Sequence, residues 1–300
     1  MKSAEKFFVT DYNLAATLMS GQAFRWKFRD DGWESVIGSR WVRLRENNDQ
    51  ILVETAEPIG EWSWLTNYLQ LDVNLAEVIA TFPDDDPMRA SVQFCRGLRL
   101  LRQDPWECLA SFILSSTKQI VQIQQIVALV CERFGEAVSV PEGHGPVFSF
   151  PGFERLALTT ETDLRNCKMG FRAPYLLGTA KMLLNKEVDL ERLRTCSVEV
   201  ARAELLKFPG VGRKIADCVL LFAYGFQEAF PVDVWVMKAL RELYFPKRTV
   251  KIKSLQKFSQ THFGPNAGYA QQYLFHYMRT KTLPQSRRGR RLSVTRRSRG

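Results

Sequence analysis

The chain has 300 residues, of which 45% are hydrophobic and 25% charged, and this composition excludes disordered, collagen-like and fibrous proteins. No apolar run reaches the roughly 18 residues that a membrane-spanning helix needs, and the N-terminus lacks the apolar region of a secretory signal. The formal net charge is +10, but the last fifteen residues hold seven arginines and no acid, and subtracting these seven leaves +3 for the rest. A basic end favours a polyanionic partner, above all nucleic acid, although a solubilising tail would explain the charge as well.

Residues 1 to about 100 have the pattern of a domain built on an antiparallel sheet. Alternating apolar and polar residues predict a strand over 24–28. Three further short strands follow, separated by turn-forming residues, at 33–37, 41–44 and 51–54. From about Glu61 the pattern becomes helical, so we expect an α+β domain here.

The chain after Asp104 is expected to be helical throughout. Pro105 suits the first position of a helix, because it has no amide hydrogen to leave unpaired. Apolar residues then recur at helical spacing as far as Phe134, with a break near 115–117. Further helices are predicted at 153–158, 161–166, 173–186, 197–207, 213–224, 234–244, 251–262 and 267–280. The expected divisions are an N-terminal α+β domain (1–100), a helical region (101–285) and a basic, disordered tail (286–300).

The cysteines and histidines give no sign of a disulfide framework or a metal site. No C-x-x-C pair and no iron–sulfur spacing occurs among Cys95, Cys108, Cys131, Cys167, Cys196 and Cys218. The three histidines are scattered along the sequence. We therefore expect a reduced, intracellular protein that uses no metal.

The most informative segment is 205–240, which contains the run L-L-K-F-P-G-V-G-R-K. One helix is expected to end at Phe208, and a second to begin near Arg213 after a tight turn whose glycines permit positive φ and close approach. Such a turn exposes amide hydrogens at a helix N-terminus, where they can hold a phosphate. This predicts a helix–hairpin–helix over about 197–225 that grips the DNA backbone, rather than an ordinary corner between helices. The expected backbone contacts are Gly210, Val211, Gly212 and Ile215.

Lys214 is the candidate nucleophile. It lies in the first turn of the second helix, where the helix dipole disfavours a cation and so favours the uncharged amine. A neutral amine can form a Schiff base, although a lysine that only touches phosphate fits the same position. Asp233 precedes an apolar helix and suits an N-cap, a role that is compatible with a carboxylate beside the lysine. Cys218 follows Lys214 by four residues and shares its helical face, so it lines the same pocket or fills the core.

These segments resemble a family of DNA repair enzymes. The hairpin lysine, followed nineteen residues later by Asp233, is similar to the helix–hairpin–helix/Gly-Pro-Asp superfamily of DNA glycosylases. Segments 20–26, 98–108, 111–116 and 264–275 narrow the resemblance to the eukaryote-type 8-oxoguanine DNA glycosylase/lyase, over roughly residues 12–280. The resemblance implies an antiparallel-sheet domain followed by an all-α helix–hairpin–helix glycosylase region. It also implies a monomer that acts on duplex DNA containing 8-oxoguanine, without a cofactor.

The resemblance further implies a pocket for an extruded base. 8-Oxoguanine carries a hydrogen on N7 where guanine has a bare acceptor, and the family detects it with a glycine carbonyl that corresponds to Gly21. Phe275 would stack on the base, and Gln271, one helical turn earlier, would hydrogen-bond its pairing edge. A plain turn glycine and a core phenylalanine are the alternative interpretations of Gly21 and Phe275.

The implied mechanism joins base removal to strand cleavage. Lys214 attacks the sugar C1′ and displaces the base, while Asp233 supports this step electrostatically. The resulting Schiff base acidifies the C2′ proton, and β-elimination cuts the strand on the 3′ side of the lesion.

Four positions depart from the family pattern. Thr117 stands where the family has an asparagine that fills the gap left by the base, and Gln122 where it has an arginine that reads the opposite cytosine. A second such arginine is retained as Arg172, but it follows Phe171 where the family usually has a tyrosine. We therefore expect weaker discrimination for cytosine opposite the lesion. Trp235 replaces a phosphate-contacting histidine, so the arginine-rich tail is expected to carry more of the DNA affinity.

Two other functions remain open at this point. A monofunctional glycosylase of the same fold would remove alkylated purines with an aspartate-activated water, but such enzymes lack the lysine. A non-enzymatic DNA-binding module would use the hairpin only as a clamp, which leaves Lys214 and Asp233 unexplained.

Overall fold

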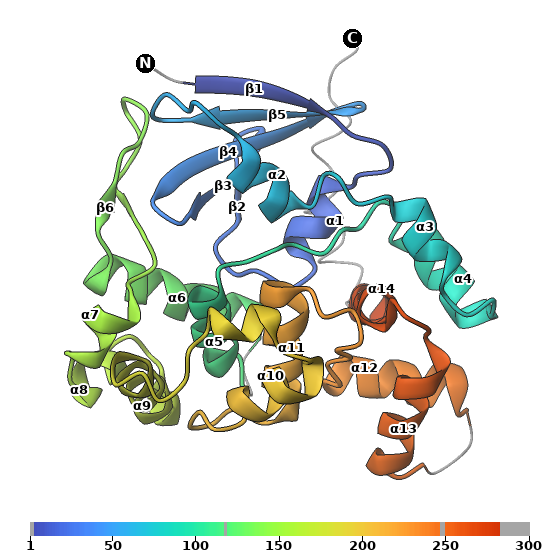
Figure 1. Ribbon diagram of the computed structural model, residues 1–300. Coiled ribbons are helices and arrows are strands. Elements are labelled where there is room, and N and C mark those ends of the chain that lie inside the picture. Colours follow the sequence, from blue (N-terminus) through green and yellow to red (C-terminus); the bar gives the residue numbers. More distant parts are fainter. Residues whose placement is uncertain (1–2, 117–118, 247–249, 283–300) are drawn as a thin grey trace.

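The structure is a computed structural model, and it describes residues 3–116, 119–246 and 250–282. A five-stranded antiparallel sheet forms one end of the molecule, and helices form the rest (Figure 1). The spatial order of the strands is β1-β5-β4-β3-β2. Their bounds are β1 Ser3–Phe8, β2 Lys27–Arg29, β3 Gly32–Ile37, β4 Arg40–Asn47 and β5 Gln50–Thr55. The predicted meander and the α+β fold class are confirmed.

The strand predicted over 24–28 is wrong in its first half. Pairing with β3 begins only at Lys27. The side chains of Phe24 and Trp26, which precede it, are buried in the hydrophobic core. The ring of Phe24 packs edge-on against Phe112, with 5.5 Å between centroids. The indole of Trp26 donates a hydrogen bond to the hydroxyl of Tyr68 (3.0 Å). Strand β1, which adds to the far edge of the sheet, was not predicted.

Four helices accompany the sheet: α1 Leu14–Met19, α2 Ser63–Leu69, α3 Leu75–Ala80 and α4 Asp86–Phe94. The first two cover one face of the sheet, where alternate residues of β4 and β5 are buried. This smaller core contains Leu14, Leu18, Val42, Leu44, Ile51, Val53, Leu65 and Leu69. Burying each such side chain stabilises the fold by about 1.5–3 kcal/mol.

The remaining helices build the larger core, within which the residues of α5 are nearly all buried. Asp104 caps α5, as Pro105 at its first position predicted, by accepting a hydrogen bond from the amide of Glu107 (2.8 Å). The helices are α5 Pro105–Leu114, α6 Ile120–Phe134, α7 Phe153–Ala157, α8 Glu161–Arg165, α9 Ala173–Leu184, α10 Val198–Leu205, α11 Arg213–Val219, α12 Val234–Ala239, α13 Ile252–His262 and α14 Ala267–Thr282. Short 3-10 turns occupy Gly170–Arg172 and Arg192–Thr195, and α11 and α12 continue into π-helical turns over Leu220–Tyr224 and Leu240–Tyr244. The helices predicted in this region are confirmed within a few residues.

A β-hairpin interrupts the region that was expected to be entirely helical. Its strands are β6 Ala137–Val138 and β7 Val147–Phe148. Glycines and prolines between 135 and 146 break the helical pattern here. The hairpin reaches along the N-terminal sheet (Figure 1), where the Ser139 hydroxyl donates to Glu57 (2.5 Å) and the His144 ring contacts Glu34 (3.1 Å). It therefore joins the helical part to the sheet. None of the helices within the described ranges is long and apolar enough to cross a membrane.

Candidate active site

Lys214 lies at the junction of α11 and α5. It is the second residue of α11, directly after the turn that ends the preceding helix. Its amine donates a hydrogen bond to the hydroxyl of Ser115 (3.2 Å), just beyond the last turn of α5, and lies 5.2 Å from the centre of the Phe112 ring. The Ser115 hydroxyl in turn donates to the carbonyl of Phe112 (2.7 Å). These contacts fix the amine of a half-buried lysine at the end of a rigid helix.

Asp233 caps α12 and lies in the same environment as the lysine. One of its oxygens accepts hydrogen bonds from the amides of Trp235 (3.0 Å) and Val236 (2.8 Å). Burial raises the pKa of Asp233, while these amides and the charge of Lys214 oppose the rise. Both interpretations of Asp233, a helix cap and a carboxylate that interacts with the lysine, therefore fit its position.

Cys218 belongs to the same cluster. Its side chain is buried one turn along α11 from Lys214. Burial raises the pKa of its thiol to about 12, with Lys214 opposing the rise and Asp233 adding to it. Lys214, Cys218 and Asp233 thus interact electrostatically, although Asp233 follows Lys214 by nineteen residues and belongs to another helix.

The predicted pocket residues Gly21 and Phe275 also meet. Gly21 has φ +80°, and a Cβ there would lie 3.3 Å from the ring of Phe275 and 2.9 Å from the side chain of Ile120. Gln22 immobilises this turn, because its amide nitrogen donates to the Thr17 carbonyl (2.9 Å) and its amide oxygen accepts from the backbone of Leu101 (2.8 Å).

Gln271 lies one turn before Phe275 on α14. Its side chain is only 3% exposed, yet its amide oxygen accepts no hydrogen bond from any described residue. A buried polar atom without a partner costs free energy, on the order of 1–3 kcal/mol. This oxygen is therefore available to a ligand that enters beside Phe275.

The ring of Tyr175 packs against the hairpin turn. Gly210 has φ +73°, and a Cβ there would lie 2.5 Å from the ring of Tyr175 on α9, so only glycine fits. The side chains of Val211 and Ile215 are buried, and their amides bond to the carbonyls of Phe208 (3.1 Å) and Gly212 (3.0 Å). Of the four expected backbone contacts, Gly210 and Gly212 are exposed.

Three residues were predicted to contact the opposite base or to fill the gap that the extruded base leaves, and the structure describes two of them. Thr117 lies outside the described residues. Gln122 is exposed and accepts a hydrogen bond from the amide of Gln119 (3.1 Å) at the start of α6. Arg172 is 2% exposed; its guanidinium donates to the carbonyls of Met169 (3.2 Å) and Ser116.

Two further predicted positions are partly exposed aromatic side chains. Phe171 is 52% exposed, and the Arg172 guanidinium lies over its ring at 4.2 Å. Trp235, predicted as a backbone contact, is half-buried on α12 with the Lys238 amine 5.9 Å from its ring centre.

Sequence reasoning missed three residues that this geometry brings in. Ser115 and Phe112 contact the amine of Lys214. Both residues lie within segment 111–116, which contributed to the family resemblance. Arg279 stands four residues beyond Phe275, and its guanidinium lies over that ring. The helical spacing from Gln271 to Phe275 to Arg279 was the available signal.

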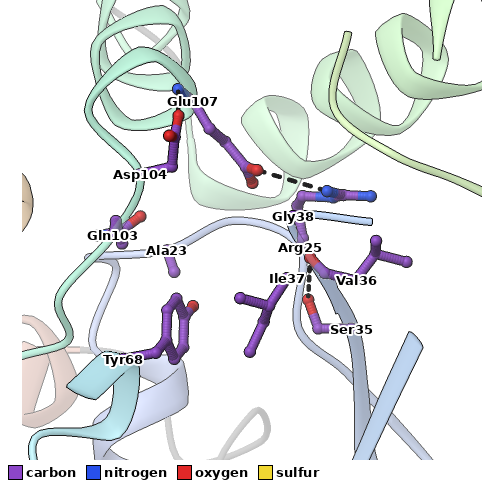
Figure 2. A pocket seen from close by; sticks show the side chains of 10 residues that line it. All are labelled: Ala23, Arg25, Ser35, Val36, Ile37, Gly38, Tyr68, Gln103, Asp104 and Glu107. Carbon is purple, nitrogen blue, oxygen red and sulfur yellow. Dashed lines mark hydrogen bonds and ion pairs between the residues drawn. The ribbon is translucent and has the colours of Figure 1, made fainter. Parts of the chain in front are cut away.

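A separate small pocket lies at the other end of α5 (Figure 2). It is lined by Tyr68, by residues of β3 and by the first turn of α5, where Glu107 pairs with Arg25 at 3.5 Å. Burial raises the pKa of Glu107, and Arg25 opposes this. None of the predicted site residues lines this pocket, and the length of α5 separates it from Lys214.

Comparison with known proteins decides the family. Residues 6–109 match the model of the 8-oxoguanine DNA glycosylase N-terminal domain, and residues 110–262 match that of the HhH-GPD superfamily of base excision DNA repair proteins. The chain belongs to the 8-oxoguanine DNA glycosylase family. As a member of this family it is an N-glycosylase/DNA lyase of base excision repair.

Individual relatives agree with this assignment. An N-glycosylase/DNA lyase of Arabidopsis thaliana is 32% identical over 283 residues, which is 89% of this chain and 77% of the relative. A probable N-glycosylase/DNA lyase of Methanothermobacter thermautotrophicus is 33% identical over 68% of this chain and 70% of its own length.

The solved structures of this family have the same fold. A Clostridium acetobutylicum 8-oxoguanine glycosylase/lyase, bound to double-stranded DNA with cytosine opposite 8-oxoguanine, superposes with a TM-score of 0.86 at 30% identity and covers 94% of this chain and 99% of that one. A 3-methyladenine DNA glycosylase of Archaeoglobus fulgidus has a TM-score of 0.77 over 93% of this chain and 100% of its own, but at 23% identity it shows a shared fold only.

Proposed function

We propose that Lys214 is the nucleophile with which this glycosylase/lyase removes 8-oxoguanine from duplex DNA. The amine gives up a proton and forms a bond to the sugar C1′ as the N-glycosidic bond breaks, and the base leaves with the bonding electrons and takes up a proton. The sugar ring then opens to a Schiff base. Loss of the C2′ proton breaks the C3′–O bond, and water later releases the lysine. The position of the amine, held by Ser115 beside Asp233, carries this proposal.

Asp233 stabilises the positive charge that develops on the sugar as the base departs. It is held in place by the two amides that it caps, so little reorganisation is needed when the charge appears. The charge of Lys214 acts on this carboxylate, which supports a position near the attacking group. Two roles in one residue explain why an aspartate follows the hairpin.

The base pocket is formed by Gly21, Gln271 and Phe275, with Cys218 nearby. The Gly21 carbonyl accepts the N7 hydrogen of the lesion, which normal guanine lacks. The unpaired amide oxygen of Gln271 takes a donor on the pairing edge, and the ring of Phe275 stacks on the base. The contact between Gly21 and Phe275 supports a shared pocket.

The hairpin, with the arginine-rich tail, holds the duplex. The first amides of α11 have no acceptor within the helix, and the exposed Gly212 precedes them. The partner is double-stranded DNA containing 8-oxoguanine, and the protein acts as a monomer wherever that DNA is. Since Gln122 is uncharged, cytosine opposite the lesion is selected less strongly than an arginine would select it.

Borohydride trapping on a duplex with one 8-oxoguanine tests the proposal. Wild-type protein is expected to form a covalent adduct that disappears in Lys214→Gln and persists in Lys186→Gln, a matched change at an exposed lysine beyond the end of α9. Excision without an adduct would instead support a monofunctional glycosylase. Binding without excision would leave only a DNA-binding module.

A further inference from the structure

Three residues of α14 form one row along the helix. Gln271, Phe275 and Arg279 are spaced by four residues, so their side chains lie on one face. The first two belong to the proposed base pocket. The guanidinium carbon of Arg279 lies 5.4 Å from the centre of the Phe275 ring, which is a cation–π distance. Arg279 therefore extends the row beyond the residues that the pocket requires.

Arg279 also binds the chain segment that leads to Gly21. Its guanidinium donates a hydrogen bond to the carbonyl of Met19, the last residue of α1. A second residue of α14, Gln272, donates to the carbonyl of Ser20 (3.0 Å). Helix α14 thus holds the two residues before Gly21 at two points, although about 250 residues separate them in sequence.

We propose that Arg279 is a positioning residue of the base pocket, whose guanidinium ties the turn before Gly21 to the ring of Phe275 and so sets the gap in which the damaged base is held. This rests on the proposed function of Gly21 and Phe275. A flat guanidinium can lie on the ring and donate in its own plane at the same time, which neither a lysine nor an apolar side chain can do.

The charge of Arg279 has a second, smaller effect. The ionisable groups that act on or with Asp233 from neighbouring elements are Lys214 and Cys218 of α11 and Arg279 of α14. Lys238, on the same helix as Asp233, faces Glu242 (3.8 Å) and Thr282 instead. Arg279 lowers the pKa of Asp233, less than Lys214 does. It therefore favours the ionised carboxylate that the first chemical step uses.

The experiment compares two substrates in single-turnover assays: a duplex with 8-oxoguanine and the same duplex with an abasic site. Arg279→Met removes the guanidinium but keeps a long side chain, Arg279→Lys keeps the charge, and Lys281→Met removes a cation of the same helical turn whose amine contacts Tyr277 (3.1 Å). Cleavage at the abasic site needs Lys214 but no base pocket.

We expect Arg279→Met to slow excision of 8-oxoguanine by roughly tenfold or more, as small misplacements in a site do, while abasic cleavage stays within about twofold. Its excision rate should fall at a higher pH than that of wild type on the acid side. Arg279→Lys should restore the pH profile but not the full excision rate, and Lys281→Met should match wild type.

Equal loss on both substrates would overturn the inference, because it would indicate damage to the fold or to Lys214. So would an unchanged excision rate in Arg279→Met. If Arg279→Met does not fold, Arg279→Lys decides: full excision in that variant would exclude a role of the planar guanidinium. Absence of excision in wild type would contradict the proposed function itself, which is a separate result.

Discussion

The amine of Lys214 lies 3.2 Å from the hydroxyl of Ser115, across the junction between α11 and α5. The hydroxyl has its own hydrogen engaged with the carbonyl of Phe112, so its lone pairs face the lysine. A lysine side chain has several rotatable bonds, and this contact selects one arrangement of them before DNA binds. The proposed nucleophile is therefore oriented in the free protein.

Ser115→Ala should slow adduct formation in borohydride trapping by about threefold to tenfold, because the amine loses its fixed orientation, a contribution of about 1 kcal/mol. The matched control is Ser91→Ala, which removes a buried hydroxyl that also bonds a carbonyl of its own helix (2.8 Å) but touches no lysine. Trapping rates of both variants, measured with saturating protein, check this. Equal rates in Ser115→Ala and wild type would contradict it.

Gly21→Ala should reduce excision by tenfold or more, on the order of the loss that a misplacement in a site causes. The added methyl group would meet Phe275 and Ile120 at a backbone with φ +80°. Gly38→Ala is the control, since Gly38 has φ +59° with nothing within 4 Å of the added carbon. Both variants should lose about 1–2 kcal/mol of stability, because alanine is strained at a positive φ. Only Gly21→Ala should lose excision, while abasic-site cleavage is retained in both.

Asp233→Asn should abolish most excision, by a factor on the order of 100 or more, because the amide cannot stabilise a developing cation as a carboxylate does. Burial raises the pKa of Asp233, so the folded state binds this proton more tightly than the unfolded state does. The ionised form therefore lowers stability relative to the protonated form, and this loss sets in as pH rises through the folded-state pKa.

Since asparagine also caps helices well, Asp233→Asn should melt at or above the wild-type temperature at neutral pH. Wild-type excision should decline on the acid side as Asp233 takes up its proton. Thermal melting and single-turnover rates across the pH range measure both effects. A variant that melts well below wild type at pH 7 would count against this account.

Removal of residues 286–300 should flatten the salt dependence of DNA binding. Each phosphate neutralised by a tail arginine contributes a slope of about −0.9 in log K against log salt. Binding to undamaged duplex at several salt concentrations measures the slope for the full and truncated chains. Equal slopes would show that the tail makes no phosphate contacts.

Opposite-base preference follows from Gln122 and Arg172. Gln122 carries no charge and is exposed at the start of α6, while the Arg172 guanidinium is engaged with backbone carbonyls. Cleavage rates with the four bases opposite the lesion should therefore differ by no more than about tenfold, since Gln122 offers no guanidinium and that of Arg172 already bonds to the protein backbone. A cytosine preference far beyond that range would refute the expectation.

Local patterns predicted much of this fold. The turn at 209–212 and the helix start at Pro105 depend on residues within one or two helical turns, so the sequence reveals them directly. Phe24 was misassigned because its alternation reflects burial against Phe112, a partner about 90 residues away. The β6–β7 hairpin was missed because its strands have only two residues each, too few for a periodic signal.

Site residues could be predicted where they belong to a family motif. They could not be predicted where they meet only through the packing of distant helices. Lys214 and Asp233 were found from the hairpin and the spacing that follows it. The contacts of Ser115 with Lys214 and of Arg279 with Met19 depend on how α5, α11, α14 and α1 pack. No pattern within any one of these helices specifies them.

The ring of Tyr175 that fills the space behind Gly210 also meets Phe171 edge-on, at 6.3 Å between centroids. Arg172, the next residue, bonds the carbonyl of Ser116, and the neighbouring Ser115 holds Lys214, four residues from Gly210. These contacts form a continuous chain that runs from Gly210 of the hairpin back to Lys214 of the same hairpin. The proposed phosphate-binding turn and the proposed nucleophile are consequently held by one continuous set of contacts, so a shift of the turn would also move the amine.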